Sequence, residues 1–291
     1  MKKTFLSIVV VISILVLSLA FVSCNNSSAT LQSSISEMGL WLERILPETF
    51  EYDMMVAQTD EKIGKLTTKV ENMAKDVAYY VYEDGITKTQ SSEKTALYTF
   101  KATKPNAYII SNELILDDGS YSQVSYTCVY NNLQFFGSYV KTVENDTTTV
   151  VVKQNEDGKK CYFKKLVNGE IVKEDNMKSD TYTSSAYYEN CMLYFALRVV
   201  TTSFNGFTFK TYDIDQKEKI QVSTTCAASE EKYVYNEVEY EYRKVSATTS
   251  NDLTGKSAAV SCYVVNDSQL INGYSNVVLA IFEGDYKYIL K

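Results

Sequence analysis

Apolar and polar residues alternate along most of the chain after residue 50. The first example is Phe50, Tyr52 and Met54, which alternate with the charged residues Glu51 and Asp53. A period of two places successive side chains on opposite faces of a strand, so the pattern predicts half-buried β-strands. We expect a second strand after a turn at 59–62. Later strands are expected at 207–214, 220–226, 233–245, 258–265, 276–282 and 286–290.

Short turn sequences separate many of these segments. Six Asp-Gly or Asn-Gly dipeptides favour the two-residue turns of β-hairpins, and the clearest hairpin joins 161–167 to 170–173. Short connections join antiparallel strands, so we predict a mainly β fold with a large, twisted antiparallel meander sheet. The six dipeptides are Asp84-Gly85, Asp118-Gly119, Asp157-Gly158, Asn168-Gly169, Asn205-Gly206 and Asn272-Gly273.

Two segments have a helical pattern instead. The apolar positions between residues 31 and 45 recur every three or four residues, which predicts an amphipathic helix that ends at Pro47. Residues 184–201 are mostly apolar and predict a buried internal helix, with a core strand at 191–200 as the alternative. This second segment marks a possible boundary, near 180–205, inside a single β-rich domain of residues 33–291. The first helix has Leu31, Ile35, Met38, Leu42 and Ile45 on its apolar face.

The first 24 residues have the pattern of an export signal. Lys2 and Lys3 precede an apolar stretch at 5–22, and Phe21-Val22-Ser23-Cys24 follows. This resembles the signal peptide and lipobox of bacterial lipoproteins, with Phe21 where that pattern usually has Leu. The resemblance implies that residues 1–23 are removed and that a lipid on Cys24 anchors the chain to a membrane through a flexible tether at 24–32. The protein would then lie on the outer face of the cell membrane, or on the outer membrane of a two-membrane host. A retained membrane helix, or an ordinary signal with an ordinary cysteine, are the alternatives.

The order of the predicted elements resembles the half-barrel of lipoprotein-carrier proteins. That resemblance implies a curved antiparallel sheet wrapped over helices, with an apolar groove between them. We therefore expect an apolar or peptide-like ligand to bind between the sheet and the internal helix. The candidate groove residues are Tyr188, Met192, Phe195 and Val199.

The amino-acid composition excludes several classes of catalytic and binding site. The chain has no histidine, so histidine-dependent hydrolytic triads and histidine-bound zinc are excluded. The formal net charge of −7 argues against a nucleic-acid partner. We find no catalytic motif and expect neither enzymatic activity, nor a cofactor, nor a metal site. Five cysteines follow Cys24, and we expect most of them to be buried as small apolar residues: Cys128, Cys161, Cys191, Cys226 and Cys262.

Two other function classes remain open. The 24 tyrosines could form the contact surface of a structural or adhesive surface protein. A glycan hydrolase could use the carboxylates of Glu237, Glu239 and Glu241, which alternate along a predicted strand, although a solvated acidic face is the favoured interpretation. Asp213 and Asp215 could hold a hard cation, but a surface turn is the better interpretation.

Overall fold

A computed structural model describes nine parts of the chain, and these contain the β-rich body. The predicted signal peptide, Cys24, the tether and the N-terminal helix lie outside the described residues. The described parts are 47–131, 135–156, 160–177, 193–198, 200–202, 208–213, 218–251, 257–266 and 268–291.

The fold is mainly β, with one 14-stranded antiparallel sheet, which confirms the predicted fold class. The alternating pattern explains the strands, because every second residue of β1 is buried: Phe50, Tyr52 and Met54. The half of the sheet that comes first in the chain is formed by β1 (Glu48–Val56), β2 (Lys62–Met73), β6 (Ala107–Leu116), β7 (Tyr121–Tyr130), β8 (Phe135–Glu144), β9 (Thr147–Glu156), β10 (Lys160–Val167) and β11 (Glu170–Met177). The other half is formed by β12 (Thr208–Asp213), β13 (Glu218–Tyr235), β14 (Val238–Asn251), β15 (Ser257–Val265), β16 (Val278–Glu283) and β17 (Tyr286–Leu290).

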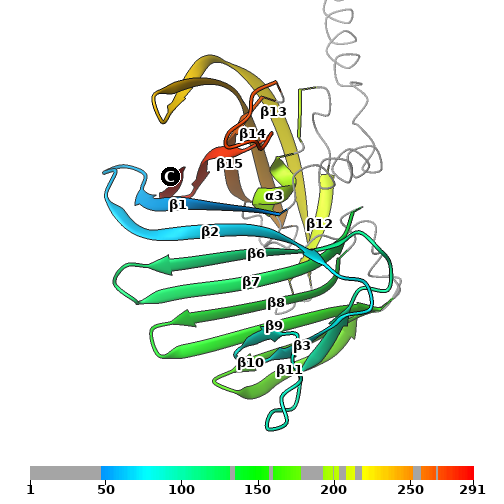
Figure 1. Cartoon of the computed structure of the whole chain (residues 1–291). Coiled ribbons are helices and arrows are strands. Elements are labelled where there is room, and N and C mark those ends of the chain that lie inside the picture. Colours follow the sequence, from blue (N-terminus) through cyan, green and yellow to red (C-terminus); the bar gives the residue numbers. More distant parts are fainter. Residues whose placement is uncertain are drawn as a thin grey trace, which may run out of the picture.

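The two halves join through the first and last strands. β1 pairs with β17 in the middle of the sheet, with Tyr52 opposite Leu290 and Met54 opposite Tyr288. The end strands are β11 and β12, and within the described residues they do not pair with each other, so the sheet is open. Figure 1 shows β6 to β11 on one side of β1 and β2, and β13 to β15 on the other. The predicted meander is therefore correct within each half, but the junction of the halves is long-range.

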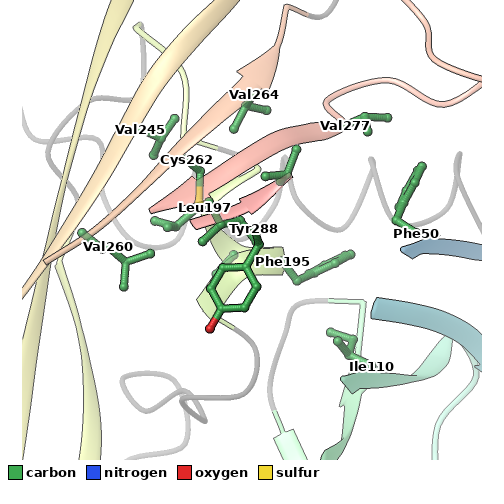
Figure 2. Close-up of a cluster of buried hydrophobic side chains, with 14 of the residues drawn as sticks. Phe50, Ile110, Phe195, Leu197, Val245, Val260, Cys262, Val264, Val277 and Tyr288 are labelled. Carbon is green, nitrogen blue, oxygen red and sulfur yellow. The ribbon is translucent and has the colours of Figure 1, made fainter. Parts of the chain in front are cut away.

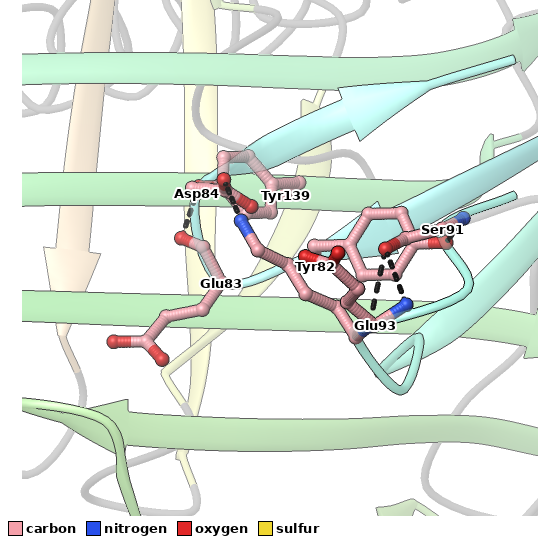
Figure 3. Close-up of polar contacts among 7 residues, drawn as sticks. Tyr82, Glu83, Asp84, Ser91, Glu93 and Tyr139 are labelled. Carbon is pink, nitrogen blue, oxygen red and sulfur yellow. Dashed lines mark hydrogen bonds and ion pairs between the residues drawn. The ribbon is translucent and has the colours of Figure 1, made fainter. Parts of the chain in front are cut away.

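A three-stranded sheet covers the outer face of the first half. It contains β3 (Ala78–Tyr82), β4 (Gly85–Thr87) and β5 (Tyr98–Lys101). The Tyr139 hydroxyl on β8 donates a 2.9 Å hydrogen bond to the Glu83 carbonyl, and the Tyr82 hydroxyl accepts one of 2.7 Å from the Ser91 amide (Figure 3). A second apolar core fills the space between the two sheets, and Phe100 and Val81 are almost completely buried in it.

The inner face of the large sheet packs around one short helix, α3 (Leu193–Leu197). Figure 2 shows Phe195 and Leu197 of this helix between strands of both halves, with Val260 and Cys262 from one half and Ile110 from the other. Helix and strand residues form one continuous core. This confirms a helix over 193–197 and excludes the alternative strand there; residues 184–192 lie outside the described parts.

The turns follow the Asn-Gly and Asp-Gly signals in part. Asn168 and Gly169 have φ of 49° and 83° and connect β10 to β11, as predicted. The predicted single strand at 233–245 is wrong, because Asn236 and Glu237 form a hairpin turn with φ of 51° and 65° between β13 and β14. The sequence signal was weak there, since Asn-Glu lacks the glycine that most easily adopts this backbone.

Candidate functional site

A cavity of about 920 Å³ lies on the inner face of the large sheet, beside α3. Both halves of the sheet contribute to its wall, and Leu193 and Tyr194 of the helix complete it. Strand residues two apart line it together, for example Asn112, Leu114 and Leu116 on β6. Because side chains two apart share a face, the cavity is bounded by one continuous, curved face of the sheet. The aliphatic lining residues are Met54, Leu66, Leu114, Leu116, Val140, Val151, Leu193 and Val260.

Polar groups occur at both ends of this cavity. Lys153 on β9 is 8% exposed, and it lines the inner end. At the other end Glu144 is exposed beside the β8–β9 turn. Glu144 on β8 lies opposite Thr147 on β9. Lys153 is six residues after Thr147 on β9, so about 20 Å of strand separates Lys153 from the level of Glu144. The cavity is thus elongated, with Lys153 at the inner end and Glu144 at the open end, and both aliphatic side chains and the polar side chains of Asn112, Gln123 and Ser125 line it between them.

Four tyrosines and two glutamates form the acidic end. Tyr121 lies opposite Glu144 in the β7–β8 pair, and Glu283 lies opposite Tyr286 in the β16–β17 pair. The Tyr194 hydroxyl donates a 2.5 Å hydrogen bond to the Glu283 carboxylate. The rings of Tyr194 and Tyr288 have centroids 6.2 Å apart. We call these six residues the tyrosine-glutamate cluster: Tyr121, Glu144, Tyr194, Glu283, Tyr286 and Tyr288.

Burial and negative charge act on the tyrosine hydroxyls of the cluster. Loss of solvent and the nearby Glu283 charge hold the pKa of Tyr194 well above its usual value. The same two causes raise the pKa of Tyr288. Burial, followed by the charges of Glu144 and Glu283, raises the pKa of Tyr121. Because Tyr121 and Glu283 come from different halves of the sheet, this interaction shows that the two halves approach each other at the cavity.

A buried ion pair fixes the end of α3 against the sheet. The Arg198 guanidinium binds the Glu48 carboxylate, and the two side chains are 5% and 2% exposed. Arg198 also donates hydrogen bonds of 2.8 Å and 3.3 Å to the backbone carbonyls of Asn276 and Ser275. Its guanidinium lies 5.6 Å from the ring centroid of Phe50 and equally far from that of Phe195. These contacts hold the helix that forms one wall of the cavity.

A second buried arginine, Arg243 on β14, binds the chain that follows the helix. It donates hydrogen bonds of 2.7 Å to the backbone carbonyls of Arg198 and Val200. It also donates to the Val265 carbonyl at 3.0 Å and to the Asn276 side-chain oxygen at 2.7 Å. Two arginines on different elements therefore position α3, and neither was recognised in the sequence as a determinant of the site.

Of the four predicted groove residues, the structure describes Phe195. It is 7% exposed, belongs to the inner core, and borders a much smaller pocket near Arg198. Tyr188, Met192 and Val199 lie outside the described residues, so their ligand contacts stay predictions. The helix residues that line the large cavity are Leu193 and Tyr194, one and two positions before Phe195. The sequence did not show which side of the predicted helix faces the cavity, because residues 184–201 are apolar at almost every position.

The other candidate residues have structural positions. Glu239 and Glu241 are exposed on β14, Glu239 pairs with Lys232 at 2.8 Å, and Glu237 lies in the hairpin turn, which fits the solvated interpretation. Asp213 ends β12, and Asp215 lies outside the described residues. Within the described parts no cluster of acidic and cysteine side chains could hold a metal ion. Of the five cysteines after Cys24, which were predicted to be mostly buried, the structure describes four. All four are buried thiols: Cys128, Cys161, Cys226 and Cys262.

Comparison with known proteins gives a limited result. No protein-family model and no curated protein matches the sequence. Among solved structures, the chain is similar to a β-barrel-like protein of the domain of unknown function DUF1849 from Brucella abortus, at 10% identity and a TM-score of 0.45. The match covers 85% of this chain and 96% of that one. In the described residues, no helix is long and apolar enough to cross a membrane. Because these comparisons assign no family, the class of protein is defined by its own fold. It has an open, curved antiparallel sheet, with a cavity between the inner face of the sheet and a helix.

Proposed function

We propose that this protein is an exported lipoprotein, anchored through Cys24, that binds an apolar or peptide-like ligand in the cavity beside α3. The observation that supports the proposal is the cavity of about 920 Å³ between the sheet and the helix, which opens to solvent at one end. Ligand pockets typically occupy about 300–1,000 Å³ and have mostly apolar walls with a few polar groups. Eight aliphatic residues and four tyrosines make up most of this wall, and the other eight lining residues are polar or charged.

A cavity of this size favours binding over a purely structural role. Protein interiors are packed with few voids larger than a water molecule, because an empty apolar space forfeits dispersion contacts. A structural or adhesive protein has no need for such a space and would be more stable with larger side chains there. Retention of small or medium residues such as Val140, Val151 and Ser125 on this face is the expected composition of a site that another molecule fills.

The anchoring part of the proposal rests on the sequence. The described sheet begins at Glu48, so about two dozen residues separate Cys24 from the first strand. The predicted tether at 24–32 and the predicted helix that ends at Pro47 would connect a lipid on Cys24 to this body. A non-catalytic carrier or receptor at the outer face of the membrane is the role we infer from the two parts together.

Native mass spectrometry on residues 25–291 tests the binding function. This chain contains every described strand and α3, so the cavity is complete in it. We expect an additional mass in the native spectrum that disappears when the same sample is denatured. A bare chain from several expression hosts would contradict the proposal and favour the structural or adhesive role.

A matched pair of variants connects the additional mass to the cavity. Val151 lines the cavity, whereas Ile171 on β11 is 51% exposed and lies outside its wall. We expect Val151→Trp to reduce the bound mass, because the indole occupies ligand volume, and Ile171→Trp to leave it unchanged. Equal retention by both variants would place the ligand elsewhere on the protein.

A separate experiment tests the anchor. We expect the full chain expressed in bacteria to fractionate with membranes and to have a mature mass that starts at Cys24 plus a lipid. The Cys24→Ser variant should lack the lipid mass. A mature chain with an unmodified Cys24 would contradict lipidation, and an intact residue 1 in the wild type would indicate the retained membrane helix.

A further inference from the structure

The open end of the cavity concentrates negative charge and aromatic rings. Its tyrosine-glutamate cluster combines four rings from β7, α3 and β17 with carboxylates from β8 and β16. Within the described part of the chain, neither Glu144 nor Glu283 forms an ion pair with a lysine or arginine. Glu283 accepts its hydrogen bond from a neutral tyrosine hydroxyl. The cluster is therefore an acidic site without a described cation from the protein.

Aromatic faces and carboxylates attract the same kind of group. The face of an aromatic ring is negative, so tyrosines bind organic cations, and several rings together form a cage for quaternary ammonium groups. Carboxylates add direct charge attraction, which is stronger at the edge of a cavity than in bulk water. Neutral and anionic head groups gain neither effect.

The position of the cluster determines which part of a ligand it would meet. Glu144 and Tyr286 are exposed, so this end opens to solvent, whereas the lining residues Met54, Leu66 and Val260 are buried. An amphiphile bound with its chain inside the cavity would keep its polar head at this opening. An anionic head entering here would be repelled by both glutamates.

We propose that the cluster binds the positively charged ammonium head of an amphiphile whose apolar chain occupies the cavity. The proposal rests on the binding function inferred above and specifies its ligand class. Glu283 and Glu144 provide the charge, Tyr121, Tyr194 and Tyr288 provide ring faces, and Tyr286 closes the exposed side.

The experiment compares ligands that share one chain and differ only in the head. Isothermal titration calorimetry on residues 25–291 would use dodecyltrimethylammonium, dodecyl maltoside and dodecanoate, each below its micelle concentration. We expect the ammonium ligand to bind about tenfold tighter than the maltoside, since a cation over aromatic rings gains on the order of 1–2 kcal/mol. Dodecanoate should bind more weakly than both.

Conservative variants locate the preference. Glu283→Gln keeps an oxygen that can accept the Tyr194 hydrogen bond, so the fold is retained while the charge is lost. This variant and Glu144→Gln at the exposed rim should each reduce the ammonium preference, and together they should remove it. Glu71→Gln, at an exposed position on β2 outside the cavity wall, is the matched control and should have no effect.

The outcomes separate this proposal from the binding function on which it rests. Equal affinities for the three ligands would overturn the ammonium site and leave the groove function intact. Tightest binding of dodecanoate would overturn it too, and would assign the head group to the Lys153 end. Absence of binding by all three would overturn the ammonium site, whereas the proposed function would be overturned by the bare chain in native mass spectrometry. An ammonium preference that persists in the double glutamine variant would also overturn the role of the cluster.

Discussion

The buried pair of Glu48 and Arg198 should be among the strongest single determinants of stability. It joins the first residue of β1 to the end of α3, across 150 positions of sequence. Both side chains are at most 5% exposed, so each charge depends on the other for compensation. Removing one member of a buried pair typically costs about 3–5 kcal/mol, because the remaining charge stays buried alone.

The contacts predict an asymmetry between the two single variants. Glu48→Gln removes a charge but leaves a polar group beside the arginine, which retains the carbonyls of Ser275 and Asn276. Arg198→Met leaves the Glu48 charge buried and also deprives those carbonyls of a donor, at about 1–3 kcal/mol each. We therefore expect the free energy of unfolding to fall by about 3 kcal/mol in Glu48→Gln and by about 5 kcal/mol or more in Arg198→Met.

The double variant tests whether the pair itself is responsible. In Glu48→Gln with Arg198→Met no lone buried charge remains, so its cost should be about 1–3 kcal/mol less than the sum of the single costs. Urea unfolding followed by far-ultraviolet circular dichroism measures all three, and melting temperatures should fall by about 2–4 °C per kcal/mol. The exposed pair of Lys232 and Glu239 is the control, and Lys232→Met should change the stability little, because solvent screens both charges. Single costs below about 1 kcal/mol, or strictly additive costs, would refute the reasoning.

Three further predictions concern the core and its titrating groups. A Cβ on Gly137 would lie 2.5–2.7 Å from ring carbons of Phe100, so Gly137→Ala should destabilise the protein by about 1–3 kcal/mol in urea unfolding. Adding Phe100→Leu should recover part of that loss, and a neutral Gly137→Ala would show that the two sheets are less tightly packed. Burial raises the pKa of Tyr194 and of Tyr288 above the unfolded value of about 10, so the associated stability is complete below that pH and is lost as pH rises through the folded values. Phenolate absorbance should therefore show tyrosines that ionise only as circular dichroism is lost, and ionisation of all tyrosines near pH 10 in folded protein would contradict this. Burial also raises the pKa of the fully buried Cys262 thiol, so peptide mapping should detect its alkylation only at urea concentrations that unfold the protein, and rapid labelling without urea would refute its burial.

Local pattern was sufficient for most of the strands. The alternation of Phe50, Tyr52 and Met54 with charged residues identified the buried face of β1, because the side-chain period of a strand is fixed by its backbone. Asn168 and Gly169 identified a hairpin, since these residues adopt positive φ at little cost. The turn at Asn236 and Glu237 was missed, because Glu237 occupies the position that glycine has in the Asn168-Gly169 turn, and the pairing of β13 with β14 imposes positive φ on it.

Long-range pairing and the cavity were decided by tertiary structure. A period of two tells which face of a strand is buried but not which distant strand lies beside it, so the pairing of β1 with β17 was not predictable from either segment. Tyr121 and Glu283 approach each other only because that pairing brings the two halves of the sheet around α3. An alternating sequence makes the inner face apolar, whereas the volume left open depends on sheet curvature and on where Arg198 and Arg243 fix the helix. The sequence by itself therefore determined the β class and the buried faces, and only the folded chain decided that part of the inner face borders a ligand-sized cavity.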